Sequence, residues 1–138
     1  MDYDQPSTDT AEFLEIKNNE TVAVNLNAYS IVLVNGNGNA TYATFDLPNV
    51  DLAAGDYFVI CADASTTPAC DLDVSPDSNL IQNGAPDAVA IMLGDTIVDA
   101  VSYEAGDMGV YTEGGGALPI RRRRLCWHFP PARWRRYQ

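Results

Sequence analysis

The residues of this chain best placed to form a covalent cross-link are two cysteines, Cys61 and Cys70. A bridge between them would close a loop of about ten residues and stabilise the fold by roughly 3 kcal/mol through loop-closure entropy. Such a disulfide implies an oxidising compartment, and the alternative is a pair of free buried thiols. The sequence places no histidine or further cysteine nearby, so zinc is not expected.

Carboxylates that alternate along one segment suggest a cation site. Asp71, Asp73 and Asp77 occupy spaced positions in residues 71–79, similar to the opening of an EF-hand loop. Pro76 stands where that loop needs glycine, and Gln82 stands where it needs a bidentate glutamate. We therefore predict at most a loose calcium site at the three aspartates and no other cofactor. The alternative is a solvated acidic loop that Cys70 holds in place.

No set of residues in the sequence predicts an enzyme. The single histidine, His128, lies close to the C-terminus, so residues 1–120 cannot assemble Ser–His or Cys–His chemistry. A metal-dependent nuclease would need carboxylates beside His or Lys and a positive approach surface. Residues 1–120 offer carboxylates on a repelling background, and we predict a non-catalytic chain.

Short apolar stretches separated by turn residues organise the sequence. Residues 35–39 (NGNGN) favour a hairpin, because Asn and Gly accept positive φ. Val22, Val24 and Leu26 alternate as the inward face of a strand, and residues 62–79 form a long loop. Strands are predicted over residues 13–16, 21–26, 29–34, 41–47, 57–61, 80–82, 88–93 and 96–103. About seven short strands without a helical period indicate an all-β, immunoglobulin-like antiparallel β-sandwich.

Five of these segments, in this order, resemble the bacterial form of the lamin tail domain family. They are residues 9–16 (DTAEFLEI), 29–36 (YSIVLVNG), 52–61 (LAAGDYFVIC), 79–90 (NLIQNGAPDAVA) and 97–103 (IVDAVSY). The resemblance implies an immunoglobulin-like sandwich that acts as a non-catalytic module of secreted or surface proteins, often beside extracellular nuclease or phosphatase domains. Animal members form the tail of nuclear lamins, a context that does not fit a chain without coiled-coil heptads or a basic domain surface.

Charge divides the chain into two parts. Residues 1–120 hold one basic residue, Lys17, and all 19 acidic residues, a formal charge of −18, and seven arginines from Arg121 onward bring the total to −11. We predict a sandwich over residues 1–116 and a basic Arg- and Trp-rich tail over residues 117–138. Three hypotheses account for the tail. It binds nucleic acid or a membrane surface, it docks on the acidic residues 1–116 of its own or a neighbouring chain, or it is the product of a shifted reading frame.

The tail begins where the family resemblance ends, so we expect the sandwich to lack its last strand. A missing strand leaves an exposed sheet edge, which predicts self-association or strand exchange with a protein partner. The acidic body repels nucleic acid, and no apolar run is long enough to span a membrane.

The disulfide and the acidic surface predict an extracellular or cell-surface location. Because Met1 is followed at once by acidic residues and not by a signal peptide, a secreted parent would make this chain an excised piece. The predicted function is protein interaction, targeting or assembly. Two alternatives remain: an accessory domain of a secreted nuclease or phosphatase whose catalytic domain would lie in cis, and a calcium-dependent adhesion, filament or surface-layer subunit.

Overall fold

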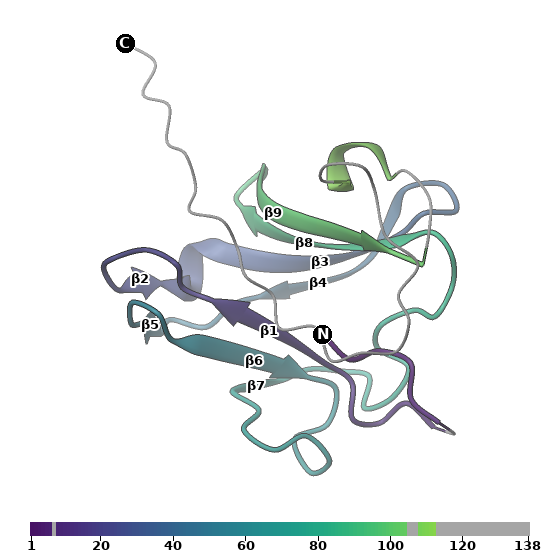
Figure 1. The fold of residues 1–138 in the computed structure, drawn as a ribbon, viewed down its shortest axis with the longest axis horizontal. Helices are drawn as coiled ribbons and strands as arrows, with labels where there is room; N and C mark the ends of the chain where they lie inside the picture. Colours follow the sequence, from purple (N-terminus) through teal and green to yellow (C-terminus); the bar gives the residue numbers. More distant parts are fainter. Residues whose placement is uncertain (7, 105–107, 113–138) are drawn as a thin grey trace.

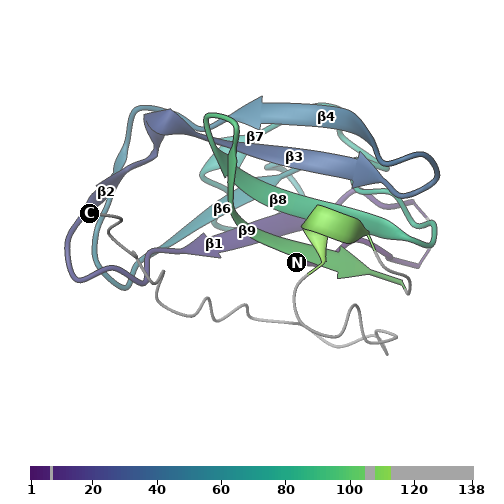
Figure 2. The same ribbon diagram turned by 90° about the horizontal axis from the view of Figure 1, so that it is seen from above.

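The protein folds as two facing β-sheets, as a computed structural model that describes residues 1–6, 8–104 and 108–112 shows (Figure 1). One sheet has the strand order β4-β3-β8-β9 and the other β1-β6-β7, while β2 and β5 form a small third ladder. The two main sheets lie in separate layers, one above the other in Figure 1, and they overlap when seen from above (Figure 2). This all-β arrangement confirms the predicted immunoglobulin-like sandwich.

The strand bounds follow the apolar segments of the sequence. The strands are β1 (Phe13–Lys17), β2 (Val24–Asn25), β3 (Tyr29–Asn35), β4 (Ala40–Asp46), β5 (Asp51–Leu52), β6 (Tyr57–Cys61), β7 (Leu72–Asp73), β8 (Asp87–Leu93) and β9 (Thr96–Tyr103). Two short 3₁₀ helices complete the described chain, η1 (Leu26–Ala28) and η2 (Gly109–Tyr111).

All neighbouring strands pair antiparallel except β6 and β7. The β3–β4 turn uses Gly38 at φ 104° and Asn39 at φ 52°, and the β8–β9 turn uses Gly94 at φ 56°. These are the conformations that Gly and Asn adopt at little steric cost. The two hairpins therefore form where the sequence predicts them.

The core lies between the sheets and is built from the alternate residues of their strands. On β3, Ile31 and Leu33 face inward, with 1% and 0% of their surface exposed, and on β6 Ile60 does the same. Fully burying one such side chain contributes roughly 1.5–3 kcal/mol. A smaller cluster of Val34, Ala88 and Met108 forms where η2 packs against the sheet.

One predicted strand is shorter than expected and another is absent. Residues 21–26 form only the short β2, and Val22 is 65% exposed instead of facing inward. The cause is Asn18, whose Nδ2 donates to the Val22 carbonyl at 2.9 Å and holds the preceding segment as a loop. Residues 80–82 are buried but form no strand, because the N–H groups of Leu80 and Ile81 bond to a side chain.

The predicted boundary at residue 116 and the basic tail over residues 117–138 lie outside the described residues. The predicted absence of a last strand concerns the same part of the chain and stays a prediction. In the described residues, no helix has the length and apolar character needed to cross a membrane.

Candidate functional site

The predicted disulfide is present and pins a surface loop to the core. Cys61 at the end of β6 is fully buried and bonds to Cys70, with the two Cα atoms 5.8 Å apart. The bridge holds the loop over residues 62–70 and delivers the chain to β7, where Leu72 pairs with Ile60. It therefore fixes β7, the short strand that lies next to β6 at the edge of this sheet.

The aspartates proposed for calcium are not brought together. The Asp71 carboxylate accepts the Val59 N–H at 2.8 Å, and the Asp73 carboxylate accepts the Ala64 N–H at 3.3 Å. Asp77 is exposed further along the loop. Across residues 1–6, 8–104 and 108–112, no three His, Cys, Asp or Glu side chains form a group able to hold a metal ion. Calcium binding at these aspartates stays a prediction.

The same contacts set the strength expected of calcium binding. To bind the ion, the three separated side chains would have to move together, and one oxygen of Asp71 and one of Asp73 already accept a backbone N–H. We therefore expect a dissociation constant no tighter than about 0.1 mM, the range of weak extracellular sites. Calorimetric titration with Ca²⁺, repeated on Asp77→Asn, measures this. Saturable heat at micromolar Ca²⁺ would contradict the expectation.

A buried carboxylate that the sequence did not single out anchors the loop before β8. Glu12 precedes β1 and is 0% exposed. Its oxygens accept the Leu80 N–H at 2.6 Å and the Ile81 N–H at 3.2 Å. Burial raises the pKa of Glu12 to about 7, with the nearby charges of Asp9 and Asp2 adding to it, although the two N–H bonds favour the ionised form. Since the carboxylate is enclosed, its role is to hold the loop and not to meet a substrate.

A second buried acid, Asp9, ties the N-terminal arm to the same loop. Its carboxylate accepts the Gln5 N–H at 2.7 Å and the Asn83 amide at 2.8 Å. Its carbonyl accepts the Asn79 N–H at 3.0 Å. The buried polar groups of Asp9 thus have partners, which keeps the cost of their burial low.

Two phenols complete this anchoring. Tyr42 accepts the Gln82 N–H at 3.0 Å, and Tyr103 donates to the Gln82 carbonyl at 3.1 Å. Burial raises the pKa of both phenols above the ordinary value, so both stay neutral near neutral pH. The Tyr3 ring packs on Tyr103 with centroids 4.7 Å apart. These aromatics are therefore part of the core and not a stacking surface for ligands.

Strand alternation in the sequence carries a signal for Glu12. In the order Glu12, Leu14, Ile16 and Asn18, every second residue is buried. A period of two therefore places Glu12 on the inward face, one position before the predicted strand. No comparable signal marks Asp9, which lies in an irregular segment among the 19 acidic residues of the chain.

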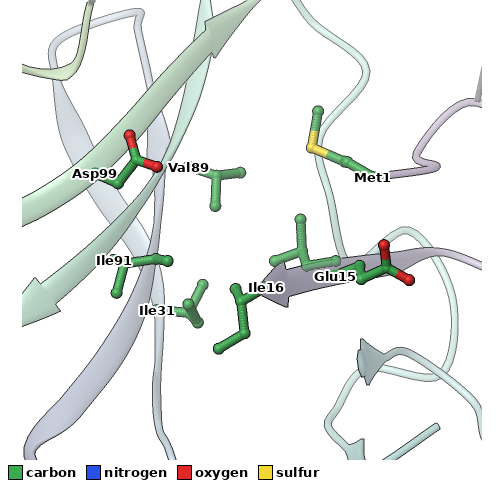
Figure 3. Close-up of a pocket in the computed structure, with 8 residues that line it drawn as sticks. Met1, Glu15, Ile16, Ile31, Val89, Ile91 and Asp99 are labelled. Carbon is green, nitrogen blue, oxygen red and sulfur yellow. The ribbon is translucent and has the colours of Figure 1, made fainter. Parts of the chain in front are cut away.

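The remaining candidate for function is the side of the sandwich where β1 and β9 lie, one edge strand of each main sheet (Figure 2). Figure 3 shows the residues that line a small pocket on this side. Leu14, Glu15 and Ile16 come from β1 and Asp99 from β9, and the lining is completed by Met1, Ile31, Val89 and Ile91. The pocket holds about 30 Å³, far below the ~300–1,000 Å³ of small-molecule sites. It is a shallow apolar slot between two strand edges.

The backbone of β1 presents unpaired groups toward this slot. The Glu12 carbonyl accepts the Ala62 N–H at 3.0 Å, so alternation turns the even-numbered residues of β1 toward β6. The N–H and C=O groups of Phe13, Glu15 and Lys17 point the other way. Phe13 exchanges two bonds of 3.0 Å with Asp2, whereas the described residues give the backbone of Glu15 and Lys17 no partner on this edge.

The edge of β9 differs because a side chain covers part of it. Gly36 N–H donates to the Pro86 carbonyl at 2.8 Å, so the even-numbered residues of β8 face β3. By the register of the sheet, Ala100 and Ser102 of β9 then face away from β8. The Ala100 N–H on this edge donates to Asp99 Oδ1 at 2.9 Å. A charged side chain placed in this way is a common means of protecting a sheet edge.

The two packed sheets of mostly antiparallel strands define an immunoglobulin-like β-sandwich module. The Lamin Tail Domain profile matches residues 1–105. The chain therefore belongs to the lamin tail domain family, which is a non-catalytic domain family. Among curated proteins, none matches the chain.

Proposed function

We propose that this domain is a non-catalytic interaction module that acts outside the cell or at its surface and binds protein through the side of its sandwich where β1 and β9 lie. The observation that carries the proposal is the β1 edge, where no other described residue pairs with the outward backbone groups of Glu15 and Lys17, which lie beside an apolar slot. An extended chain that pairs with such an edge gains main-chain hydrogen bonds and buries apolar surface.

The disulfide supports the proposed location. Structural disulfides persist in oxidising compartments and are rare in the cytosol. The cysteines Cys61 and Cys70 are bonded in the structure. A formal charge of −18 over residues 1–120 further suits a protein partner over nucleic acid.

We expect the full chain to self-associate reversibly at tens of micromolar, and Glu15→Pro to abolish this. The Glu15 N–H faces away from β6, so proline there removes no bond of the sheet but removes the donor an incoming strand needs. Sedimentation velocity over a concentration series measures the association, and thermal unfolding checks that the variant is folded.

The matched control is Thr44→Pro on β4, at the opposite edge of the other sheet. Leu47 N–H donates to the Tyr29 carbonyl at 3.0 Å, so alternation turns the Thr44 N–H away from β3 as well. Thr44→Pro should associate as the parent chain does. A monomeric parent chain, or loss of association only in Thr44→Pro, would count against the β1 edge.

A further inference from the structure

We infer that Asn37 is a site of spontaneous covalent modification, where the side-chain amide is lost as ammonia and the residue becomes aspartate or isoaspartate. Glycine after asparagine favours this reaction, because the absence of a Cβ lets the following backbone nitrogen approach the side chain. The chain contains three such pairs, Asn35-Gly36, Asn37-Gly38 and Asn83-Gly84. Their surroundings in the fold differ, and the chemistry is separate from the protein binding proposed above.

The reaction balances with water as its co-reactant. The Gly38 backbone nitrogen attacks Asn37 Cγ and loses its proton, the bond from Cγ to the side-chain nitrogen breaks, and ammonia leaves behind a succinimide ring. Water then opens the ring. Cleavage between Cγ and the Gly38 nitrogen gives aspartate, whereas cleavage at the backbone carbonyl carbon gives isoaspartate, in which the chain runs through Cγ. The rate therefore depends on how freely the nitrogen and Cγ can meet.

The pair Asn35-Gly36 is held at both reacting groups. The Gly36 N–H donates to the Pro86 carbonyl at 2.8 Å and to Asp87 Oδ1 at 3.3 Å. The Asn35 side chain donates from Nδ2 to Gln82 Oε1 at 2.8 Å. A Cβ added at Gly36 would collide with the Pro86 carbonyl oxygen, so the backbone there has little room to rotate. Both groups of this pair must leave their partners before they can react.

The pair Asn83-Gly84 is held in the same way, although Asn83 is exposed. The Gly84 N–H donates to Asp87 Oδ2 at 3.2 Å, and Asn83 Nδ2 donates to the buried Asp9 carboxylate at 2.8 Å. Asp87 itself is 2% exposed. Its two oxygens each accept one of the attacking nitrogens, so a single buried carboxylate protects two of the three pairs.

Asn37 lacks this protection. It lies in the exposed turn between β3 and β4, which projects from one end of the sandwich (Figure 2). Among the residues that the structure describes, none bonds to the side-chain amide of Asn37. The Gly38 N–H donates within the turn, to the Gly36 carbonyl at 2.8 Å, and a Cβ added at Gly38 would have nothing within 4 Å. Local motion of the turn therefore suffices to bring the nitrogen and Cγ together.

Chymotryptic peptide mapping of the full chain, after incubation at mildly alkaline pH, measures the conversion at each pair. Fragment-ion spectra locate the converted residue and separate isoaspartate from aspartate. We expect Asn37 to convert at least about tenfold faster than Asn35 or Asn83, a ratio that corresponds to about 1.4 kcal/mol for opening the protected segments. The same incubation in urea is the matched control, since the three pairs should then convert at similar rates.

Two variants test the cause. Asn37→Gln should remove the first acidic species that anion exchange resolves, because the longer side chain would have to close a larger ring. Asp87→Asn keeps the shape of the side chain but turns an NH₂ toward one of the two glycine N–H groups. It should raise conversion at Asn35 or Asn83 several-fold and leave the rate at Asn37 unchanged, with thermal unfolding as the check that the variant is folded.

Equal rates at the three pairs in the folded chain, or fastest conversion at Asn35 or Asn83, would refute the inference. Conversion of Asn37 in urea but not in the folded chain would refute it too, since the turn would then hold Asn37 as firmly as the packed segments hold the other pairs. Unchanged rates at Asn35 and Asn83 in folded Asp87→Asn would refute the protective role of Asp87. Should Asp87→Asn not fold, the comparison of the folded and urea-unfolded parent chain decides.

Discussion

Glu12→Gln is expected to destabilise the domain at about pH 5 and to lose much of that deficit at about pH 8. In the parent protein the protonated carboxyl is well tolerated in its buried site, whereas the ionised carboxylate is penalised by desolvation. The pKa of about 7 in the folded state, against an ordinary 4.5, reflects this preference. Glutamine never ionises, so the stability of the variant does not fall over this pH range and its deficit relative to the parent narrows as pH rises.

The direction of the pH effect follows from proton binding. Between pH 4.5 and about pH 7 the folded state retains the proton of Glu12 and the unfolded state releases it. The free energy of unfolding therefore falls as pH rises through this window, by up to about 3 kcal/mol, because a tenfold difference in proton affinity corresponds to roughly 1.4 kcal/mol. Below pH 4.5 both states are protonated, and this contribution is fully present.

The deficit of Glu12→Gln at about pH 5 has a separate cause. Glu12 accepts two backbone N–H groups, from Leu80 and Ile81. The glutamine amide offers one acceptor and turns an NH₂ toward the other donor. Leaving one buried donor unsatisfied costs about 1–3 kcal/mol.

Urea unfolding of the parent chain and Glu12→Gln at the two pH values measures the effect. Glu15→Gln is the matched control, because Glu15 lies on the same edge region of β1 but is partly exposed, and it should change stability by less than about 0.5 kcal/mol. A deficit of Glu12→Gln that is constant between the two pH values would show that Glu12 is already ionised at pH 5.

The sequence predicted the main sheet because its central strands are short apolar runs. β3 and β8 lie in the middle of their sheet, where Leu33, Val34 and Val89 are buried on successive positions or on both faces, so each strand is a continuous apolar segment in the sequence. Where no neighbouring strand supports an apolar segment, the prediction failed. Val22 and the loop at Leu80 are examples, since the side chains of Asn18 and Glu12 bond to the backbone there in place of a neighbouring strand.

The candidate site was less predictable because it depends on the arrangement of two sheets. An exposed edge was expected from the sequence, but nothing in the sequence shows that β1 and β9 lie on the same side of the sandwich (Figure 2). The alternating aspartates had the spacing of a cation loop, yet Asp71 and Asp73 accept bonds from the backbone of other segments. Spaced carboxylates form a cation site only when the loop folds so that their side chains converge on one point.

Removal of the Cys61–Cys70 bridge is expected to lower the free energy of unfolding by about 3 kcal/mol, as for other loops of about ten residues. The loss should be felt first at β7, because Leu72 and Asp73 pair with β6 over only two residues. Without the cross-link, the unfolded chain gains freedom and this short parallel pairing is left to hold the loop alone.

The test compares Cys126→Ser with Cys61→Ala/Cys70→Ala/Cys126→Ser, so that no free thiol can exchange with the bridge. Urea unfolding gives the difference in free energy, and hydrogen exchange reports the opening of β7. Adding a reductant to Cys126→Ser should reproduce the loss, whereas the triple variant should not respond. Equal unfolding midpoints for both proteins would show that the core and the anchors of Glu12 and Asp9 hold the fold unaided. In that case the fold would not depend on the disulfide, and the disulfide would be weaker support for an extracellular location.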